Sequence, residues 1–138
     1  MTGTGTHYCL AAMASYRSSV SIEASVNETF AFVREVRNFP RFVERVSSVE
    51  PLGGESIRVT LVEAGHHRTV EGYARVHESG RHRRVEWGVD GTDHYHGWVE
   101  VDQEGEVCSV TMDVDAPEVD GSEVDAALWA LKAAVEGR

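Results

Sequence analysis

Polar and apolar residues alternate along most of the chain, which is the pattern of half-buried β-strands. Turn signals that contain glycine, such as Ser79-Gly80 and Glu104-Gly105, separate successive alternating segments. Because connections this short join neighbouring antiparallel strands, we expect hairpins and a curved antiparallel sheet of about seven strands. The predicted strands cover residues 18–23, 46–50, 56–63, 67–77, 82–89, 92–102 and 106–114.

A helical pattern interrupts the alternation after the first strand. An S-x-x-E capping box at residues 25–28 precedes an apolar stripe, which predicts a helix over residues 26–36. Asn38 could cap a second short helix, residues 39–43, with Pro40 in its first turn.

A longer helical pattern closes the chain after Pro117. Ser122 is the expected cap, and an apolar stripe that includes Val124 and Leu131 continues to Glu136. At 1.5 Å per residue, this helix is roughly 22 Å long. One curved sheet must cover its apolar face, and only this helix is long enough to do so. The element order therefore predicts an α+β helix-grip fold, in which the sheet wraps around a C-terminal helix and two short helices follow the first strand.

The composition changes this picture mainly by exclusion. Of 138 residues, 13 are Lys or Arg and 23 are Asp or Glu, which gives a formal net charge of −10. A protein that binds nucleic acid or an anionic membrane surface needs the opposite sign of charge. The sequence holds no apolar run of the length that spans a bilayer, so we expect no membrane span.

The amino end is expected to lie apart from the domain. Residues 1–14 are predicted to be a disordered or loosely ordered extension, and residues 15–138 a single domain; Met13 is a second plausible start. The apolar stretch at residues 9–14 is too short for a signal peptide, and the two cysteines match no CxxC or metal-ligand spacing. We therefore expect a cytoplasmic protein without a cofactor.

Several local phrases carry a family resemblance: SIEASVNETFAFVREV at residues 21–36, NFPRF at 38–42, RVEW at 84–87 and YHGWVEV at 95–101. Together with the element order, they resemble the START-like superfamily, also called SRPBCC, which includes polyketide cyclases/dehydrases and lipid-transfer domains. The resemblance implies a cavity between the sheet and the C-terminal helix that holds an apolar or aromatic small molecule. The superfamily has no universal catalytic motif, so it implies no catalytic residue. The short closing helix favours a small cavity.

In each strand, we assign the more apolar register to the inward face, toward the helix. Gly72, Ala74 and Gly97 are small residues on this face and leave room for a ligand or for close approach of the helix; Val76 shares their face. Phe30, Phe32, Phe39 and Phe42, in the short helices, are expected to line or gate the cavity mouth. The predicted ligand-binding residues are Val70, Ala74, Val85, Trp87, Tyr95, Gly97, Val99, Val110, Met112, Leu128 and Leu131.

The inward face is nearly free of acids and bases: Tyr95, Arg68 and whatever the loops supply are the candidates for proton transfer. This scarcity favours ligand binding over catalysis. A shift of one residue in register would reverse this argument. One alternative is an enzyme of the polyketide aromatase/cyclase type, with Tyr95 as the first candidate acid or base. Another is a non-catalytic interaction module with a collapsed pocket.

The outward face carries two further candidates. His94 and His96 form an H-x-H pair of the kind that can bind zinc, but an outward pair is more typical of a solvated sheet face, so we expect no metal site. Trp98 lies in the same register, and an exposed Trp there could mark a homodimer interface.

Overall fold

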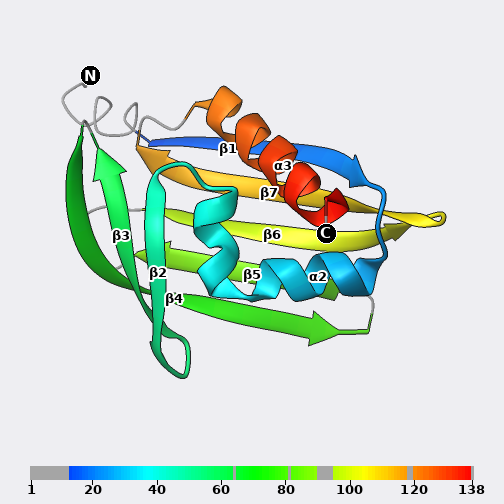
Figure 1. Ribbon diagram of the computed structural model, residues 1–138, viewed down its shortest axis with the longest axis horizontal. Coiled ribbons are helices and arrows are strands. Elements are labelled where there is room, and N and C mark those ends of the chain that lie inside the picture. The colour runs from blue at the N-terminus through cyan, green and yellow to red at the C-terminus, as the bar shows by residue number, and fades with distance from the viewer. Residues whose placement is uncertain (1–12, 64, 81, 90–94, 118–119, 138) are drawn as a thin grey trace, which may run out of the picture.

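The computed structural model describes residues 13–63, 65–80, 82–89, 95–117 and 120–137. Within these residues the chain forms one seven-stranded sheet and three helical segments (Figure 1). The elements in chain order are β1 (Met13–Ile22), α2 (Val26–Arg34), the 3₁₀ helix η1 (Val36–Arg41), β2 (Val46–Gly53), β3 (Ser56–Glu63), β4 (His66–Ser79), β5 (His82–Val89), β6 (His96–Glu104), β7 (Val107–Pro117) and α3 (Gly121–Glu136).

The strand order is β1-β7-β6-β5-β4-β3-β2, and every neighbouring pair is antiparallel. Strands β2 to β7 therefore lie in sequence order, as tight hairpins require. The turns predicted at Gly80 and Gly105 are confirmed, because both residues adopt a positive φ, 58° and 60°, that favours glycine. β1 pairs with β7, so the sheet stays open and has β1 and β2 as its edges.

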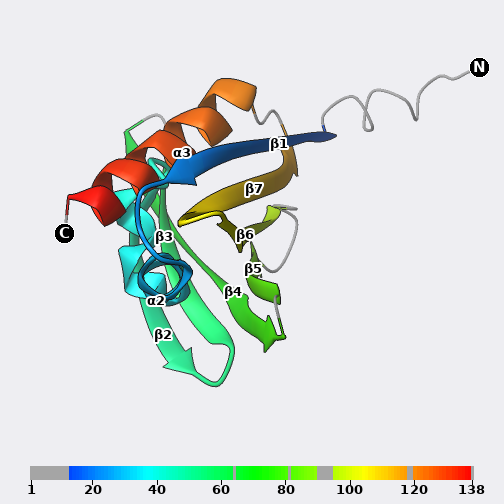
Figure 2. The same cartoon turned by 90° about the vertical axis from the view of Figure 1, so that its right-hand side faces the viewer.

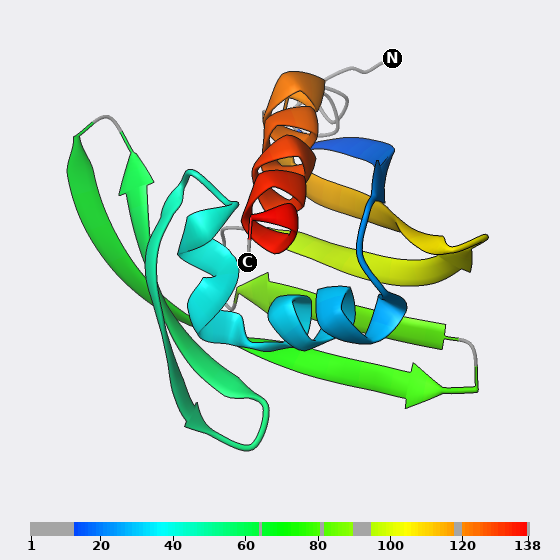
Figure 3. The same cartoon turned by 45° about the vertical axis from the view of Figure 1, so that its right-hand side comes forward.

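The three helical segments lie on the same face of the sheet (Figure 2). α3 packs mainly against β1 and β7, η1 packs against β2, and α2 lies over the middle strands (Figure 3). The sheet curves around α3, so the α+β helix-grip fold expected from the element order is confirmed.

Several predicted ends of elements are wrong by a few residues. The helix predicted to reach residue 36 ends at Arg34, although Ser25 caps it as predicted and accepts a hydrogen bond from Glu28 N at 3.0 Å. Asn38 does not cap the second helix: Glu35 does, and Asn38 Nδ2 donates to Phe32 O at 2.9 Å. The sequence alone does not decide which of several neighbouring residues caps a helix.

Two further boundaries differ. Asp120, not Ser122, is the N-cap of α3, and it accepts hydrogen bonds from both Ser122 N and Ser122 Oγ at 2.7 Å. β1 begins at Met13 rather than at residue 18, because the ladder with β7 continues to Pro117. Residues 1–12 lie outside the described residues, so the boundary of the extension stays a prediction.

The predicted inward register is confirmed for most strands. The buried inward residues are Ile22, Ile57, Val59, Leu61, Val85, Trp87, Val89, Val99, Val101, Cys108, Val110, Met112 and Val114. Val76 is the exception, with 40% of its surface exposed. β3 pairs with β4 only as far as Tyr73, so Val76 lies where the sheet has narrowed.

α3 is held against β1 by packing and by polar contacts. Its buried side chains are Val124, Ala127, Leu128, Leu131 and Val135. Lys132 Nζ donates to Ser21 O at 2.7 Å, and Ser18 Oγ donates to Asp125 at 2.6 Å. These contacts fix the position of the helix along the edge strand, while Trp129 on the opposite side remains 62% exposed.

The outer face of the sheet has its own packing around Trp98. The guanidinium groups of Arg84 and Arg17 lie 4.0 and 5.0 Å from the centre of the Trp98 ring. Each arginine also pairs with an acid: Arg84 with Glu100 at 3.1 Å, and Arg17 with Asp113 at 3.0 Å. The chain thus covers part of this ring itself, and a homodimer interface at Trp98 stays a prediction.

Two further expectations concern a metal site and a membrane span. His96 is exposed at the start of β6, whereas His94 lies outside the described residues. Within the part of the chain that the structure describes, no three His, Cys, Asp or Glu side chains come together as a metal site would need. No helix in those same segments has the length and apolar character needed to span a membrane.

The packing of α3 predicts that two substitutions on that helix change the stability of the protein to very different extents. Leu131→Ala empties a fully buried position and should lower the free energy of unfolding by roughly 2–5 kcal/mol. Trp129→Ala, on the exposed side, should change it by less than about 0.5 kcal/mol. Urea denaturation of both variants measures this; a larger loss for Trp129→Ala would mean that α3 packs through a different face.

Candidate functional site

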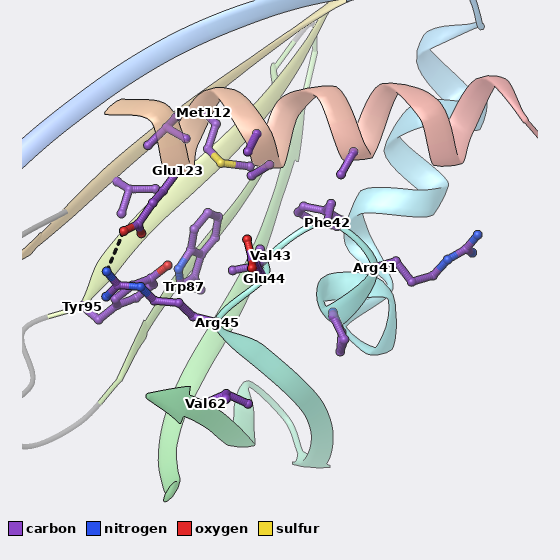
Figure 4. A pocket seen from close by; sticks show the side chains of 16 residues that line it. Arg41, Phe42, Val43, Glu44, Arg45, Val62, Trp87, Tyr95, Met112 and Glu123 are labelled. Carbon is purple, nitrogen blue, oxygen red and sulfur yellow. Dashed lines mark hydrogen bonds and ion pairs between the residues drawn. The ribbon is translucent and has the colours of Figure 1, made fainter. Parts of the chain in front are cut away.

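A cavity of about 650 Å³ lies between the sheet, the segment that joins η1 to β2, and the N-terminal half of α3 (Figure 4). It is partly open to solvent. Its lining consists of Pro40, Arg41, Phe42, Val43, Glu44, Arg45, Val62, Trp87, Tyr95, Met112, Val114, Glu123, Val124, Ala126, Ala127 and Ala130. A cavity of this size means that the pocket is not collapsed.

The interior of the cavity is mainly apolar. Trp87 of β5 and Met112 of β7 come from the inward face of the sheet, and both are buried. α3 contributes the small side chains of Ala126, Ala127 and Ala130 to the lining, and small side chains leave space unfilled. Glu123 and Val124 of α3 also belong to the lining, whereas the buried side chains of Leu128, Leu131 and Val135 do not.

Trp87 is seated on the backbone of β6. Its cross-strand partner is Gly97, and a Cβ atom at position 97 would lie only 2.4 Å from Trp87 Cζ2. The ring of Phe39 in η1 and the indole form an edge-to-face pair, with ring centroids 5.7 Å apart and an interplanar angle of 65°. Glycine at position 97 is therefore what allows the indole to pack against the sheet.

The mouth of the cavity is polar. Arg45, just before β2, donates from Nη2 to Glu123 Oε1 in the first turn of α3 at 2.7 Å, and Figure 4 shows this pair next to Tyr95. Both side chains are more than a third exposed, so the pair contributes only about 0.2–1 kcal/mol to stability. Its effect is to place charge at the rim rather than inside.

Tyr95 brings a phenol into the cavity. Burial raises the pKa of this phenol, nearby Glu123 raises it further, and Arg45 opposes them. Val89 N donates to Tyr95 O at 3.0 Å, which continues the β5–β6 ladder and fixes the backbone there. Tyr95 is therefore a protonated hydroxyl group at neutral pH.

The structure brings together three of the predicted ligand-binding residues, Trp87, Tyr95 and Met112. Of the four phenylalanines expected at the mouth, it places Phe42 in the lining, but not Phe30, Phe32 or Phe39. The other predicted ligand-binding residues do not line the cavity: Val70, Ala74, Val85, Gly97, Val99, Val110, Leu128 and Leu131. Most of these are on the inward face but are covered by helices, by other core residues or, at Gly97, by the indole.

Sequence reasoning missed the charged rim and the alanines of α3. Of the two ionisable candidates predicted for the inward face, Tyr95, directly before β6, is in the described lining and Arg68 is not; Glu44, Arg45 and Glu123 come from a loop and a helix. The cluster of alanines at positions 126, 127 and 130 was the signal in the sequence for the side of the cavity that α3 forms. The sequence holds no comparable signal for the loop residues, because their position depends on tertiary packing.

Comparisons with known proteins agree with this architecture. The profile of the family "Polyketide cyclase / dehydrase and lipid transport" matches residues 13–138. No protein of curated function matches the chain in sequence.

Three solved structures illustrate the likeness of fold. A protein from Deinococcus radiodurans is 16% identical with a TM-score of 0.74, over 89% of this chain and 97% of that one. The ZhuI aromatase/cyclase from Streptomyces sp. R1128 is 14% identical with a TM-score of 0.71, over 91% and 95%. A START superfamily protein from Mycobacterium smegmatis is 13% identical with a TM-score of 0.67, over 90% and 95%. At these identities, the likeness concerns the fold alone.

Because the indole of Trp87 packs against the backbone at Gly97, we predict that Gly97→Ala is destabilising. The added methyl would overlap the indole and also approach Asp113 O at 2.9 Å, so we expect a loss of about 1–3 kcal/mol and a shift in Trp fluorescence. Gly121→Ala is the matched control, because its methyl meets only the side chain of Tyr16, and it should be nearly neutral. Equal stability of the two variants would show that Trp87 is not seated on Gly97.

Proposed function

The chain belongs to the polyketide cyclase / dehydrase and lipid transport family, and on this premise we propose that it binds a small apolar or aromatic molecule in the cavity under α3. The observation that carries the proposal is the cavity itself. Its volume of about 650 Å³ falls within the range of roughly 300–1,000 Å³ that small-molecule sites occupy. Its interior is apolar, and its mouth is polar and open.

The affinity would come from removing apolar ligand surface from water. This contributes roughly 25 cal/mol for each Å² buried, before the cost of ordering the ligand is subtracted. The indole of Trp87 offers an aromatic wall on which a flat ring can pack. Met112 adds a flexible side chain that adapts to different ligand shapes. The proposal also keeps the cytoplasmic location that the cysteine pattern predicts.

A second candidate function is that of a cyclase-type enzyme, and the observation that favours it is the phenol of Tyr95 inside the cavity. Because its pKa is raised, Tyr95 would act as a general acid that donates its proton to a substrate oxygen, and not as a base. Much of the rate enhancement would come from holding a reactive chain in a folded conformation.

Filling the cavity from α3 tests ligand binding. Ala127→Leu places a larger side chain in the cavity lining. It should weaken the binding of aromatic ligands at least about tenfold, since it removes the volume they would occupy. Ala133→Leu, on the exposed side of the same helix, is the matched control and should bind as the wild type does. Calorimetric titration measures both; equal affinities would place the ligand elsewhere.

The enzymatic alternative has its own test. If the protein cyclises a linear poly-β-ketone, Tyr95→Phe should lower kcat by roughly 10²-fold or more while ligand binding persists. Tyr73→Phe removes a phenol from the opposite face of the sheet and should leave kcat unchanged. The absence of turnover by the wild type, or full activity of Tyr95→Phe, would contradict a role of Tyr95 as acid.

A further inference from the structure

Two polar groups inside the cavity have no partner within the described part of the chain. The indole N–H of Trp87 and the hydroxyl of Tyr95 both belong to residues that line the cavity, and neither makes a hydrogen bond to the described residues. Trp87 is 7% exposed, so the ring around that N–H is almost fully buried. A ligand that fills the cavity would displace water from both groups.

The two groups are neighbours on one face of the sheet. Trp87 is paired with Gly97, and Tyr95 stands two residues before Gly97 on the same side of the extended chain. In Figure 4 the indole nitrogen and the phenol hydroxyl lie on the same side of the cavity, next to the Arg45–Glu123 pair. This diagonal arrangement lets two donors approach one ligand atom.

The chemistry of these groups requires an acceptor on the ligand. An indole N–H can only donate, and the raised pKa of Tyr95 keeps its hydroxyl able to donate as well. A pure hydrocarbon would strip water from both donors and leave them buried without a partner, which is unfavourable. One carbonyl oxygen has two lone pairs and can accept from both donors.

The charges around the cavity disfavour an anionic acceptor. Arg45 is already paired with Glu123, and the guanidinium of Arg41 lies over the ring of Phe32, 5.1 Å from its centre. Glu44 adds a second acid to the lining, and the whole chain carries a formal net charge of −10. The lining therefore carries two arginines and two glutamates, but Arg45 is already paired and Figure 4 shows the guanidinium of Arg41 directed away from the other lining side chains. A carboxylate inside the cavity would gain little from either cation and would lie near two acids.

We infer that the cavity selects a neutral aromatic carbonyl compound over a carboxylic acid or a hydrocarbon of the same shape, and that Trp87 and Tyr95 recognise the carbonyl oxygen. The inference rests on the proposed ligand-binding function and names the chemical class of the ligand. The two residues act as specificity determinants, while the apolar walls supply most of the affinity.

Three probes of nearly equal shape test the inference: 2-acetylnaphthalene, 2-naphthoate and 2-isopropenylnaphthalene, which carry a ketone, a carboxylate and a hydrocarbon group on the same ring. Calorimetric titration at neutral pH should give the ketone the lowest Kd, by about tenfold or more over each of the others. Tyr95→Phe and Trp87→Phe each remove one donor and should reduce the ratio between ketone and hydrocarbon affinities. Tyr73→Phe, on the outer face, should preserve that ratio.

The possible outcomes distinguish a failure of the inference about the carbonyl ligand from a failure of the proposed ligand-binding function. Equal binding of ketone and hydrocarbon, or tightest binding of 2-naphthoate, would overturn the inference and leave the proposed function standing. A ketone preference that survives both Tyr95→Phe and Trp87→Phe would overturn the assignment of these residues. If none of the three probes binds to the wild type, the proposed function fails and the inference fails with it.

Discussion

The cavity depends on one close contact, the indole of Trp87 packed on the bare backbone of Gly97. Because glycine has no Cβ, a large aromatic ring fits against the sheet and does not have to extend toward α3. On the helix side, the lining includes the small side chains of Ala126, Ala127 and Ala130. The side chains of a protein core normally pack to the density of an organic crystal. An apolar space of this size therefore persists only where the residues on both sides are too small to fill it. Here the small residue is glycine on one side and alanine on the other.

The distribution of polar groups follows from the same geometry. Charged side chains such as Arg45 and Glu123 come from a loop and from the first turn of a helix, which lie at the solvent-facing end of the cavity. The sheet supplies the interior, where a charge without a partner would be costly. The phenol of Tyr95 and the indole of Trp87 are polar enough to orient a ligand and apolar enough to be buried. This gradient favours a molecule with an apolar body and one polar atom.

Alternation of side chains predicted the fold and part of the lining of the cavity, because a strand offers only two registers and one of them was clearly more apolar. Trp87, Tyr95 and Met112 were found in this way. The same pattern cannot separate inward residues that line the cavity from those that helices cover, such as Val85, since this depends on where α2 and α3 come to lie. The Arg45–Glu123 pair joins residues 78 positions apart, so no local sequence pattern predicts it.

Intermolecular NOEs between 2-acetylnaphthalene and the methyl groups of the protein test the central claim most directly, because they locate the ligand without a substitution. The account predicts NOEs from the naphthalene ring to the methyl groups of Met112 and Ala127, which both line the cavity. NOEs to Ala133 on the exposed side of α3, with none to Met112, would contradict it.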